Sequence, residues 1–296
     1  MADLDSWTSP DEVVEALAQQ NYVLDRALAM STYLGARLGK PLLLEGEPGC
    51  GKTELAKALA AATGTELIRL QCFEGLDVRS ALYDWNYPKQ MLTIRLHERD
   101  ESPAAVEKEI FTERFLLRRP LLRALEQSGP HRPVLLIDEI DRADEEFEGL
   151  LLEVLSDFQV TIPELGTIKA RRPPMVIITS NRTRDLSDAL KRRCLYAFVD
   201  YPTIERETEI LRKRIPEVGE QLAREVVGFV QRLRHDKELA KRPGVAETLD
   251  WAAALFALHR QSLDPEVVDE TLGCLLKDAQ DVQLVHDRGI GRLLAS

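Results

Sequence analysis

The sequence predicts an α/β protein in which a parallel sheet is sandwiched by helices, followed by an α-helical domain. The first observation is a set of short, almost wholly apolar segments, which are typical of strands buried on both faces of a parallel sheet. These segments are KPLLLEG, ELIRLQC, RPVLLIDE, RPPMVIITSN and LYAFVDY. The second observation is that strand and helix patterns alternate through residue 201. The third is that the chain from Thr203 onward has helical spacing and no strand signal.

This change of character divides the chain into two expected domains. Residues 1–202 are expected to form the α/β domain, and residues 203–296 the helical one. Residues 11–38 are predicted to form one helix that ends at Gly39. The segment EEFEGLLLEVLSDF is predicted to be an amphipathic helix between two buried strands. In the helical domain, proline residues separate the successive helices, at Pro216, Pro243 and Pro265.

Bulk composition excludes several classes of protein. The 296-residue chain has a net charge of −11, which disfavours a protein that wraps nucleic acid through phosphate contacts. The acidic N-terminus MADLDSWTSPDE does not resemble a signal peptide, and no apolar run approaches the ~18 residues of a membrane span. The cysteines form no C-x-x-C pair, so neither a zinc site nor a redox motif is predicted; they are Cys50, Cys72, Cys194 and Cys274. We therefore expect a cytoplasmic protein with reduced thiols.

The segment GEPGCGKT, residues 46–53, matches the phosphate-binding pattern G-x-x-x-x-G-K-[ST] between a predicted strand and a predicted helix. Its glycines let backbone N–H groups curl toward a phosphate chain, and the following helix presents its positive N-terminus to the same anion. Lys52 is expected to reach the β- and γ-phosphates, and Thr53 to offer its hydroxyl to Mg²⁺. The predicted nucleotide-binding residues are Gly46, Glu47, Pro48, Gly49, Cys50, Gly51, Lys52, Thr53 and Glu54.

Three further motifs carry candidate catalytic residues. In VLLIDE, Asp138 is predicted to hold Mg²⁺ and Glu139 to polarise an attacking water. The next strand ends in TSN, where Asn181 is either a loop-starting residue or an amide that orients this water. KRRCLY places Arg192 and Arg193 before the fifth strand. They form either a solvated basic turn or a finger inserted into the nucleotide of a neighbouring subunit, with Arg193 the better candidate.

Taken in this order, the P-loop, VLLIDE, TSN, the paired arginines and the helical region resemble an AAA+ ATPase over essentially the whole chain. The segment at about residues 73–95 lies where some AAA+ clades carry an insert in helix 2. The segment at about residues 159–170 resembles a β-hairpin that precedes the Asn181 strand. Together these features resemble the MoxR group. FEGLDVRSALYDWNYPKQMLTIR and RPGVAETLDWAAAL further resemble its CoxD-type branch, which accompanies carbon monoxide dehydrogenase.

The resemblance implies a P-loop NTPase fold with a helical lid, and ATP and Mg²⁺ as cofactors. It also implies a hexameric ring that acts as a remodelling chaperone in metalloenzyme maturation, with a von Willebrand factor A domain partner. The implied client is a molybdenum–copper carbon monoxide dehydrogenase or a related molybdenum hydroxylase. Neither nucleic acid nor a membrane is expected as a partner. Many AAA+ lids carry a sensing arginine where this chain reads Ala246-Glu247-Thr248, so either Arg242 substitutes for it or that sensor is absent.

The main alternative is an AAA+ nucleic-acid motor or loader related to helicases. The basic cluster RLRHDKELAKR, residues 232–242, would fit such a motor, but it is predicted to be a solvated helix face. A metabolic P-loop kinase is disfavoured because it has no use for the helical lid and the paired arginines.

The aromatic segment SALYDWNYPKQML also has two interpretations. In the first, Tyr83, Trp85 and Tyr87 belong to a loop that faces the ring pore or the client. In the second, the segment packs in the core, anchored by Leu82, Met91 and Leu92. The first interpretation is preferred.

Overall fold

The computed structural model describes residues 4–97, 109–127 and 129–295. The described residues divide into two compact units. The first unit comprises the described residues of Met1–Ala16, Asp25–Glu45 and Leu55–Phe198. The second comprises those of Leu17–Leu24, Gly46–Glu54 and Val199–Ser296. The phosphate-binding segment therefore packs with the C-terminal helices.

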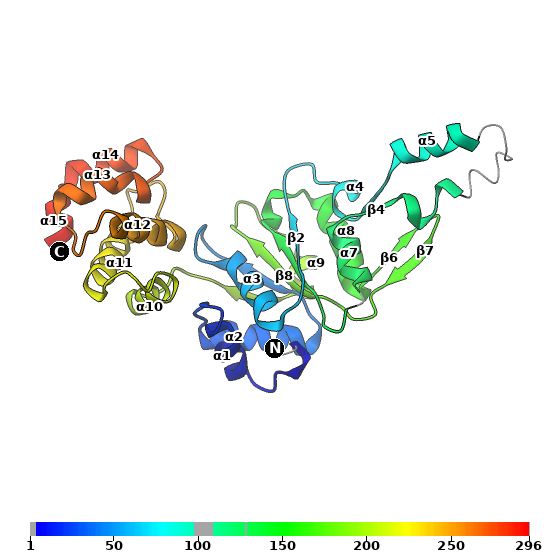
Figure 1. The fold of residues 1–296 in the computed structure, drawn as a ribbon, viewed down its shortest axis with the longest axis horizontal. Coiled ribbons are helices and arrows are strands. Elements are labelled where there is room, and N and C mark those ends of the chain that lie inside the picture. Colours follow the sequence, from blue (N-terminus) through cyan, green and yellow to red (C-terminus); the bar gives the residue numbers. More distant parts are fainter. Residues whose placement is uncertain (1–3, 98–108, 128, 296) are drawn as a thin grey trace. The chain divides into compact units, whose positions relative to one another are not determined.

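In the described part of the first unit, five strands form a parallel sheet in the order β2-β5-β8-β1-β9 (Figure 1). The strands are β1 (Leu42–Glu45), β2 (Leu67–Gln71), β5 (Val134–Asp138), β8 (Met175–Ser180) and β9 (Leu195–Phe198). Every residue of β1, β5 and β8 is buried, which explains their continuous apolar sequences. The predicted α/β fold with a parallel sheet flanked by helices is confirmed.

Helices pack against both halves of this sheet. Helix α2 (Arg26–Leu38) contacts β1 and β9, and α7 (Pro120–Glu126) contacts β2 and β5. Alternate side chains of a strand point to opposite faces, so each central strand supplies residues to both layers. One core cluster joins strand residues to α7 and to α8 (Glu145–Asp157), and includes Leu43, Leu135, Ile137, Val176, Ile178, Leu121, Leu125, Leu151 and Val154.

The N-terminal helical segment differs from its prediction as one helix. The structure has η1 (Leu4–Ser6), α1 (Pro10–Ala18) and then a separate α2. Asn21 between the helices has φ 56°, a left-handed conformation that interrupts an α-helix. The Asp25 side chain then accepts a hydrogen bond from the Leu28 N–H at 2.7 Å and starts α2 as an N-cap. The apolar spacing continues across this break, which is why periodicity alone does not reveal it.

The aromatic segment forms several short elements at one end of the first unit (Figure 1). Strand β3 (Tyr83–Trp85) pairs antiparallel with β4 (Leu116–Arg118). The flanking elements are α4 (Val78–Ala81), α5 (Tyr87–His97) and η2 (Glu113–Phe115). Much of the segment predicted at about 73–95 is thus regular structure.

The aromatic side chains of this segment do not act as one group. Trp85 is 7% exposed and packs edge-to-face on Phe111, with ring centroids 5.3 Å apart. Tyr87, in contrast, is 48% exposed. The preferred interpretation of a client-facing loop is therefore wrong for Trp85, which belongs to the core together with Leu82. The packing alternative is wrong for Met91 and Leu92, which are 54% and 59% exposed.

A hairpin precedes β8. Strand β6 (Gln159–Ile162) pairs antiparallel with β7 (Gly166–Lys169), with Val160 opposite Ile168. Gly166 at the turn has φ 86°, which glycine adopts without steric cost. Two further short helices of this unit are η3 (Ile140–Arg142) and α9 (Asp188–Arg193).

The described residues of the second unit contain helices and no strand. The C-terminal helices are α10 (Ile204–Arg214), α11 (Glu220–His235), α12 (Val245–Ala257), α13 (Pro265–Leu275), α14 (Ala279–Arg288) and α15 (Ile290–Ala295). Their apolar faces share a core in which Trp251 is fully buried and lies 5.5 Å from the Phe229 ring centroid. Across the described ranges of the chain, no helix is long and apolar enough to span a membrane.

Candidate functional site

Polar residues gather at the carboxyl ends of three neighbouring strands, which together form one edge of the sheet, called the sheet edge below. Gln71 of β2 stands opposite Asp138 of β5, and Ile137 of β5 stands opposite Ile178 of β8. Residues that follow these parallel strands, Glu139 and Asn181, therefore emerge at the same edge. The carboxyl ends of parallel strands are the usual position of ligand sites in α/β proteins.

Asp138 is held from two sides. Its carboxylate is buried, and Oδ1 accepts a hydrogen bond from the Thr179 hydroxyl at 2.6 Å. Oδ2 accepts bonds from Arg69 Nη2 at 2.6 Å and Arg69 Nε at 3.1 Å. Carboxylate oxygen is the ligand type that Mg²⁺ prefers, and the guanidinium shows that this oxygen attracts a cation. The residue present thus fits the predicted metal ligand.

Glu139 stands in a strained backbone conformation. Its φ of 55° and ψ of 52° are left-handed, which is uncommon for a residue with a side chain and recurs at functional sites. Its N–H donates to the Thr179 hydroxyl oxygen at 2.9 Å. Glu139 Oε2 accepts bonds from Gln71 Nε2 at 3.0 Å and Arg142 Nη1 at 3.1 Å. Asn181 Nδ2 lies 3.5 Å from Oε1. The structure therefore brings Asp138, Glu139 and Asn181 together.

A second buried carboxylate fixes the turn that carries Asn181. Asp141 is 3% exposed and accepts bonds from the Asn181 N–H at 3.1 Å and the Thr183 N–H at 2.9 Å. The Thr183 hydroxyl adds a bond of 2.7 Å. Burial raises the pKa of Asp141, but these hydrogen bonds outweigh it and leave the pKa below its ordinary value. Asp141 is thus a charged anchor for the loop after β8.

The paired arginines lie at the C-terminal end of α9, and both are exposed. Arg193 Nε donates to the Ser156 hydroxyl at 3.0 Å, and Arg193 Nη1 donates to the Ala189 carbonyl at 3.3 Å. Arg192 is on the same helix end. An exposed position suits either a basic turn or a finger, and the finger stays a prediction.

The phosphate-binding segment, in the second unit, has the backbone that its glycines predict. Gly49 and Gly51 have φ values of 76° and 98°. Gly46 is also sterically required, since a Cβ there would lie 2.0 Å from the Val199 carbonyl oxygen. Lys52 is buried, and its Nζ donates to the Gly46 and Glu47 carbonyls at 2.7 and 2.8 Å. The ammonium group is therefore folded back onto its own loop.

The flanking residues of this segment are also placed. Cys50 is buried, and burial raises the pKa of its thiol, so that it remains uncharged. Thr53 is half-buried in the first turn of α3 (Lys52–Thr63), and its bond to Mg²⁺ stays a prediction. Glu54 accepts a bond from Arg214 Nη2 at 2.7 Å. Tyr22 donates its hydroxyl to the Gly51 carbonyl at 3.4 Å.

Residues of the segment before α10 and of the start of α12 donate hydrogen bonds to this loop. The Val245 N–H donates to the Gly49 carbonyl at 2.9 Å, and the Tyr201 hydroxyl donates to the Pro48 carbonyl at 3.1 Å. At the start of α12, Glu247 accepts a bond from the Gly244 N–H at 3.0 Å and so caps its own helix. Arg242 is exposed.

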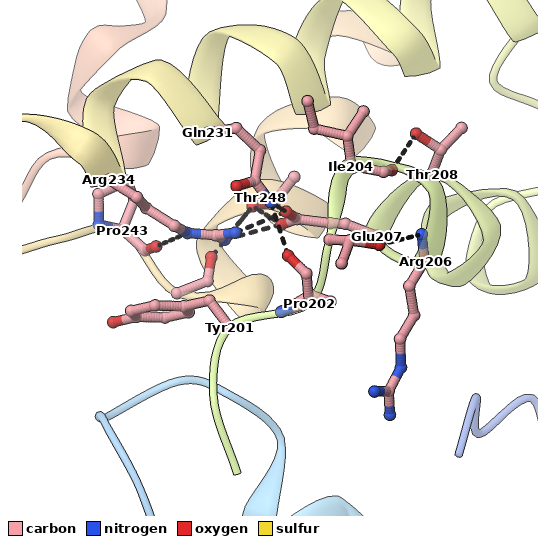
Figure 2. A network of polar contacts seen from close by, with 12 residues as sticks. Tyr201, Pro202, Ile204, Arg206, Glu207, Thr208, Gln231, Arg234, Pro243 and Thr248 are labelled. Carbon is pink, nitrogen blue, oxygen red and sulfur yellow. Dashed lines mark hydrogen bonds and ion pairs between the residues drawn. The ribbon is translucent and has the colours of Figure 1, made fainter. Parts of the chain in front are cut away.

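The basic cluster of residues 232–242 is not the uniformly solvated helix face that its sequence predicts. Arg234 is 5% exposed and forms a bidentate ion pair with Glu207 (Figure 2). The prediction is wrong for this residue because a solvated arginine and a paired, buried one look alike in a sequence. Their difference depends on Glu207, which lies 27 residues earlier in the chain.

Sequence reasoning also missed residues at the sheet edge. Arg69 and Gln71 alternate with the buried Ile68 and Leu70 along β2, so their pattern did signal a polar edge. Asp141 and Thr183 carried no comparable signal, because neither belongs to a recognised motif and their contact spans 42 residues.

Comparison with known proteins gives the family. Residues 41–194, just over half of the chain, match the family described as AAA domain (dynein-related subfamily). An uncharacterized protein of Staphylococcus haemolyticus is 26% identical over 75% of this chain and 76% of its own length. Lon protease 1 of Myxococcus xanthus is 32% identical over 45% of this chain but only 14% of its own length. A solved structure of a RuvB variant from Thermotoga maritima is similar over 95% of this chain and 74% of its own, with 19% identity and a TM-score of 0.49. The family match shows that this chain belongs to the AAA domain family, in its dynein-related subfamily.

Proposed function

We propose that this AAA+ chain is a Mg²⁺-dependent ATPase of the MoxR group that uses ATP hydrolysis to remodel a protein client. The observation that most supports hydrolysis is the polar cluster at the sheet edge. There the Glu139 carboxylate contacts Gln71, Arg142 and Asn181, one residue after the buried Asp138. A carboxylate oriented beside a metal ligand is what activation of water for phosphoryl transfer requires.

In this proposal each candidate site residue has a definite role in binding or hydrolysis. Backbone N–H groups of residues 46–53 bind the phosphates, and Lys52 exchanges its two carbonyl acceptors for phosphate oxygens. Thr53 and Asp138 would hold Mg²⁺, which supplies neutralising charge to the phosphates when bound. Glu139 accepts the proton of the attacking water, and the Asn181 amide orients this water.

The proposed ring assigns a task to Arg193 in the neighbouring subunit, where it stabilises charge on the transferring phosphoryl group. Its exposure at the end of α9 is compatible with such a reach. In mixed rings, an Arg193→Ala subunit should lower the ATPase rate of its wild-type neighbour, by about 10³-fold or more per affected site. If the variant lowers only its own rate, Arg193 does not act in trans. Arg192→Ala is the matched comparison.

The MoxR assignment is supported by the aromatic segment and by the β6–β7 hairpin, together with the CoxD-like sequences around residues 73–95 and 242–255. On this basis the proposed partners are a von Willebrand factor A domain protein and a molybdenum hydroxylase client of the carbon monoxide dehydrogenase type. Within the aromatic segment, the exposed Tyr87, Met91 and Leu92 replace Trp85 as candidates for client contact.

A trapping experiment tests this function. Glu139→Gln should bind ATP, hydrolyse it slowly and retain the client, which is then identified by mass spectrometry after affinity purification. Lys52→Ala, which should not bind ATP, is the control. Enrichment of a molybdenum hydroxylase by the first variant alone supports the proposal. Salt-sensitive stimulation of the ATPase by DNA, without such enrichment, would instead favour a nucleic-acid motor.

A further inference from the structure

A buried polar network in the C-terminal helices surrounds the Arg234 guanidinium (Figure 2). Its Nη1 and Nη2 donate to the two oxygens of Glu207 at 2.5 and 2.7 Å. Nη2 also lies 3.1 Å from the Thr248 hydroxyl, and Nε donates to the Pro243 carbonyl at 2.7 Å. The side chains of Arg234 and Glu207 are 3% and 1% exposed. The pair is therefore almost completely removed from water.

The network also fixes the segment that leads into α10. Gln231 Nε2 donates to the Pro202 carbonyl and to Glu207 Oε2, both at 2.8 Å. The Tyr201 ring lies against the guanidinium, with the Arg234 carbon 4.6 Å from the ring centroid. Figure 2 shows this ring on the side of the guanidinium that faces away from Gln231. Arg234 thus contacts residues on both sides of α11 in sequence, Tyr201 before it and Pro243 after it.

Both of these segments end on the phosphate-binding loop. The residues next to Pro243 approach Gly49 so closely that a Cβ on Gly49 would lie 2.8 Å from the Gly244 Cα, and the Val245 N–H binds the Gly49 carbonyl. The Tyr201 hydroxyl binds the neighbouring Pro48 carbonyl. Burial raises the pKa of Tyr201 to about 12, although the nearby Arg234 charge opposes this, so the phenol stays a donor. The adjacent Pro48 and Gly49 carbonyls thus accept hydrogen bonds from two segments of the chain, and both segments contact the Arg234 guanidinium.

We infer that Arg234 is a positioning residue for the nucleotide site, which acts through Tyr201 and Gly244–Val245 on the Pro48 and Gly49 carbonyls. This inference rests on the proposed function, because it assumes that the loop binds nucleotide. Because the C=O and the N–H of a trans peptide point in opposite directions, holding the Pro48 and Gly49 carbonyls also fixes the direction of the Gly49 and Cys50 N–H groups, which bind phosphate in the proposed function. A buried ion pair adds little net stability relative to apolar packing, whereas a positional use explains its bidentate geometry.

Nucleotide affinity measured without hydrolysis tests this inference. The dissociation constant of fluorescently labelled ADP is measured, with EDTA present, for the wild type and for Arg234→Lys, Tyr201→Phe and the double variant. Lysine keeps the charge but cannot hold Glu207 and Pro243 together. The dissociation constant of ADP for Arg234→Lys should therefore rise about tenfold, an effect of the size expected when a binding group is displaced. Tyr201→Phe removes one hydrogen bond and should raise it about threefold. The dissociation constant of the double variant should rise by less than the product of the two single fold-changes, because Arg234 acts partly through Tyr201.

The matched control is Arg224→Ala, on the same helix, whose pair with Glu220 is exposed to solvent. It should bind ADP like the wild type. In ATPase assays Arg234→Lys should raise KM with kcat nearly unchanged, a split that simple loss of folded protein would not give. Unchanged ADP affinity in folded Arg234→Lys overturns the inference. If that variant does not fold, wild-type affinity of Tyr201→Phe and of Gly244→Ala overturns it. Failure of the wild type to bind ADP would instead reject the proposed function.

Discussion

Two arginine–carboxylate pairs in this molecule differ in the exposure of the arginine and in hydrogen-bond geometry. The side chains of Arg234 and Glu207 are 3% and 1% exposed, and they meet through two parallel hydrogen bonds inside a closed network. Arg69 and Asp138 are 50% and 4% exposed, and the arginine holds a single carboxylate oxygen from the solvent side. The first pair cannot separate without stranding a buried charge. The second can exchange its arginine for another cation, which suits a carboxylate that we propose as a metal ligand.

The largest effect should arise at the sheet edge, where chemistry is proposed. Glu139→Gln removes the proton acceptor but keeps the shape of the side chain, so kcat should fall about 10²- to 10⁴-fold while nucleotide affinity is retained. Phosphate release and labelled-nucleotide binding measure the two quantities. Glu153→Gln, an exposed change on α8, should leave both unchanged. A wild-type rate for the Glu139→Gln variant would exclude Glu139 as the proton acceptor.

The two regions also differ in how far their residues can be predicted from sequence. At the sheet edge, the candidate residues stand in short contiguous motifs at strand ends, so VLLIDE and TSN by themselves point to Asp138, Glu139 and Asn181. Their restraining partners escape prediction, because Gln71 contacts Glu139 across 68 residues and Asp141 contacts Thr183 across 42. Continuous apolar runs likewise predict the five strands of the sheet, but helical spacing does not predict the N-cap at Asp25, where α2 starts as a separate helix.

In the C-terminal helices, sequence patterns predict the helices but not their buried charges. Arg234 looks like one of several surface cations, and only the fold shows that it pairs with Glu207. The aromatic segment behaves in the same way, since Trp85 is buried and Met91 exposed although their sequence context suggests the reverse. Side chains whose environment is set by distant segments cannot be assigned from their neighbours in the chain.

The second effect in size should be on the stability of the C-terminal helices. Glu207→Ala would leave the Arg234 guanidinium buried without its carboxylate, at a cost of about 3–5 kcal/mol in the free energy of unfolding. Denaturant unfolding followed by tryptophan fluorescence, to which the buried Trp251 contributes, measures this loss. Glu220→Ala, which breaks an exposed pair on α11, should change the same quantity by less than about 1 kcal/mol. Equal effects of the two variants would contradict the contrast between buried and exposed pairs.

The third effect tests the charged anchor at the sheet edge. Asp141→Asn keeps a side-chain oxygen but replaces one hydrogen-bond acceptor with a donor, so stability at neutral pH should fall by about 1–3 kcal/mol. Because the folded-state pKa of Asp141 lies below its ordinary value of 3.8, its stabilisation is present above that value and is lost as the pH falls through the folded-state pKa. The difference between wild type and variant should therefore shrink in acid. Urea unfolding from neutral pH to below pH 3.8 measures it, and a constant difference would exclude the charge as its cause.

The smallest effect on stability, yet the most specific, should come from Arg69→Ala. The arginine is half exposed, so its loss should lower the free energy of unfolding by only about 1 kcal/mol. Arg69 holds the Asp138 oxygen that a metal ion would also attract, so the variant should need less Mg²⁺ for half-maximal Mg²⁺-dependent binding of labelled ATP, by about two- to tenfold. Arg123→Ala removes an arginine of similar exposure, which pairs with Glu66 in the same unit, and this variant should need as much Mg²⁺ as the wild type. If Arg69→Ala needs more Mg²⁺, the arginine orients Asp138 for the metal instead of competing with it, and the two pairs of this molecule would then share one positional use.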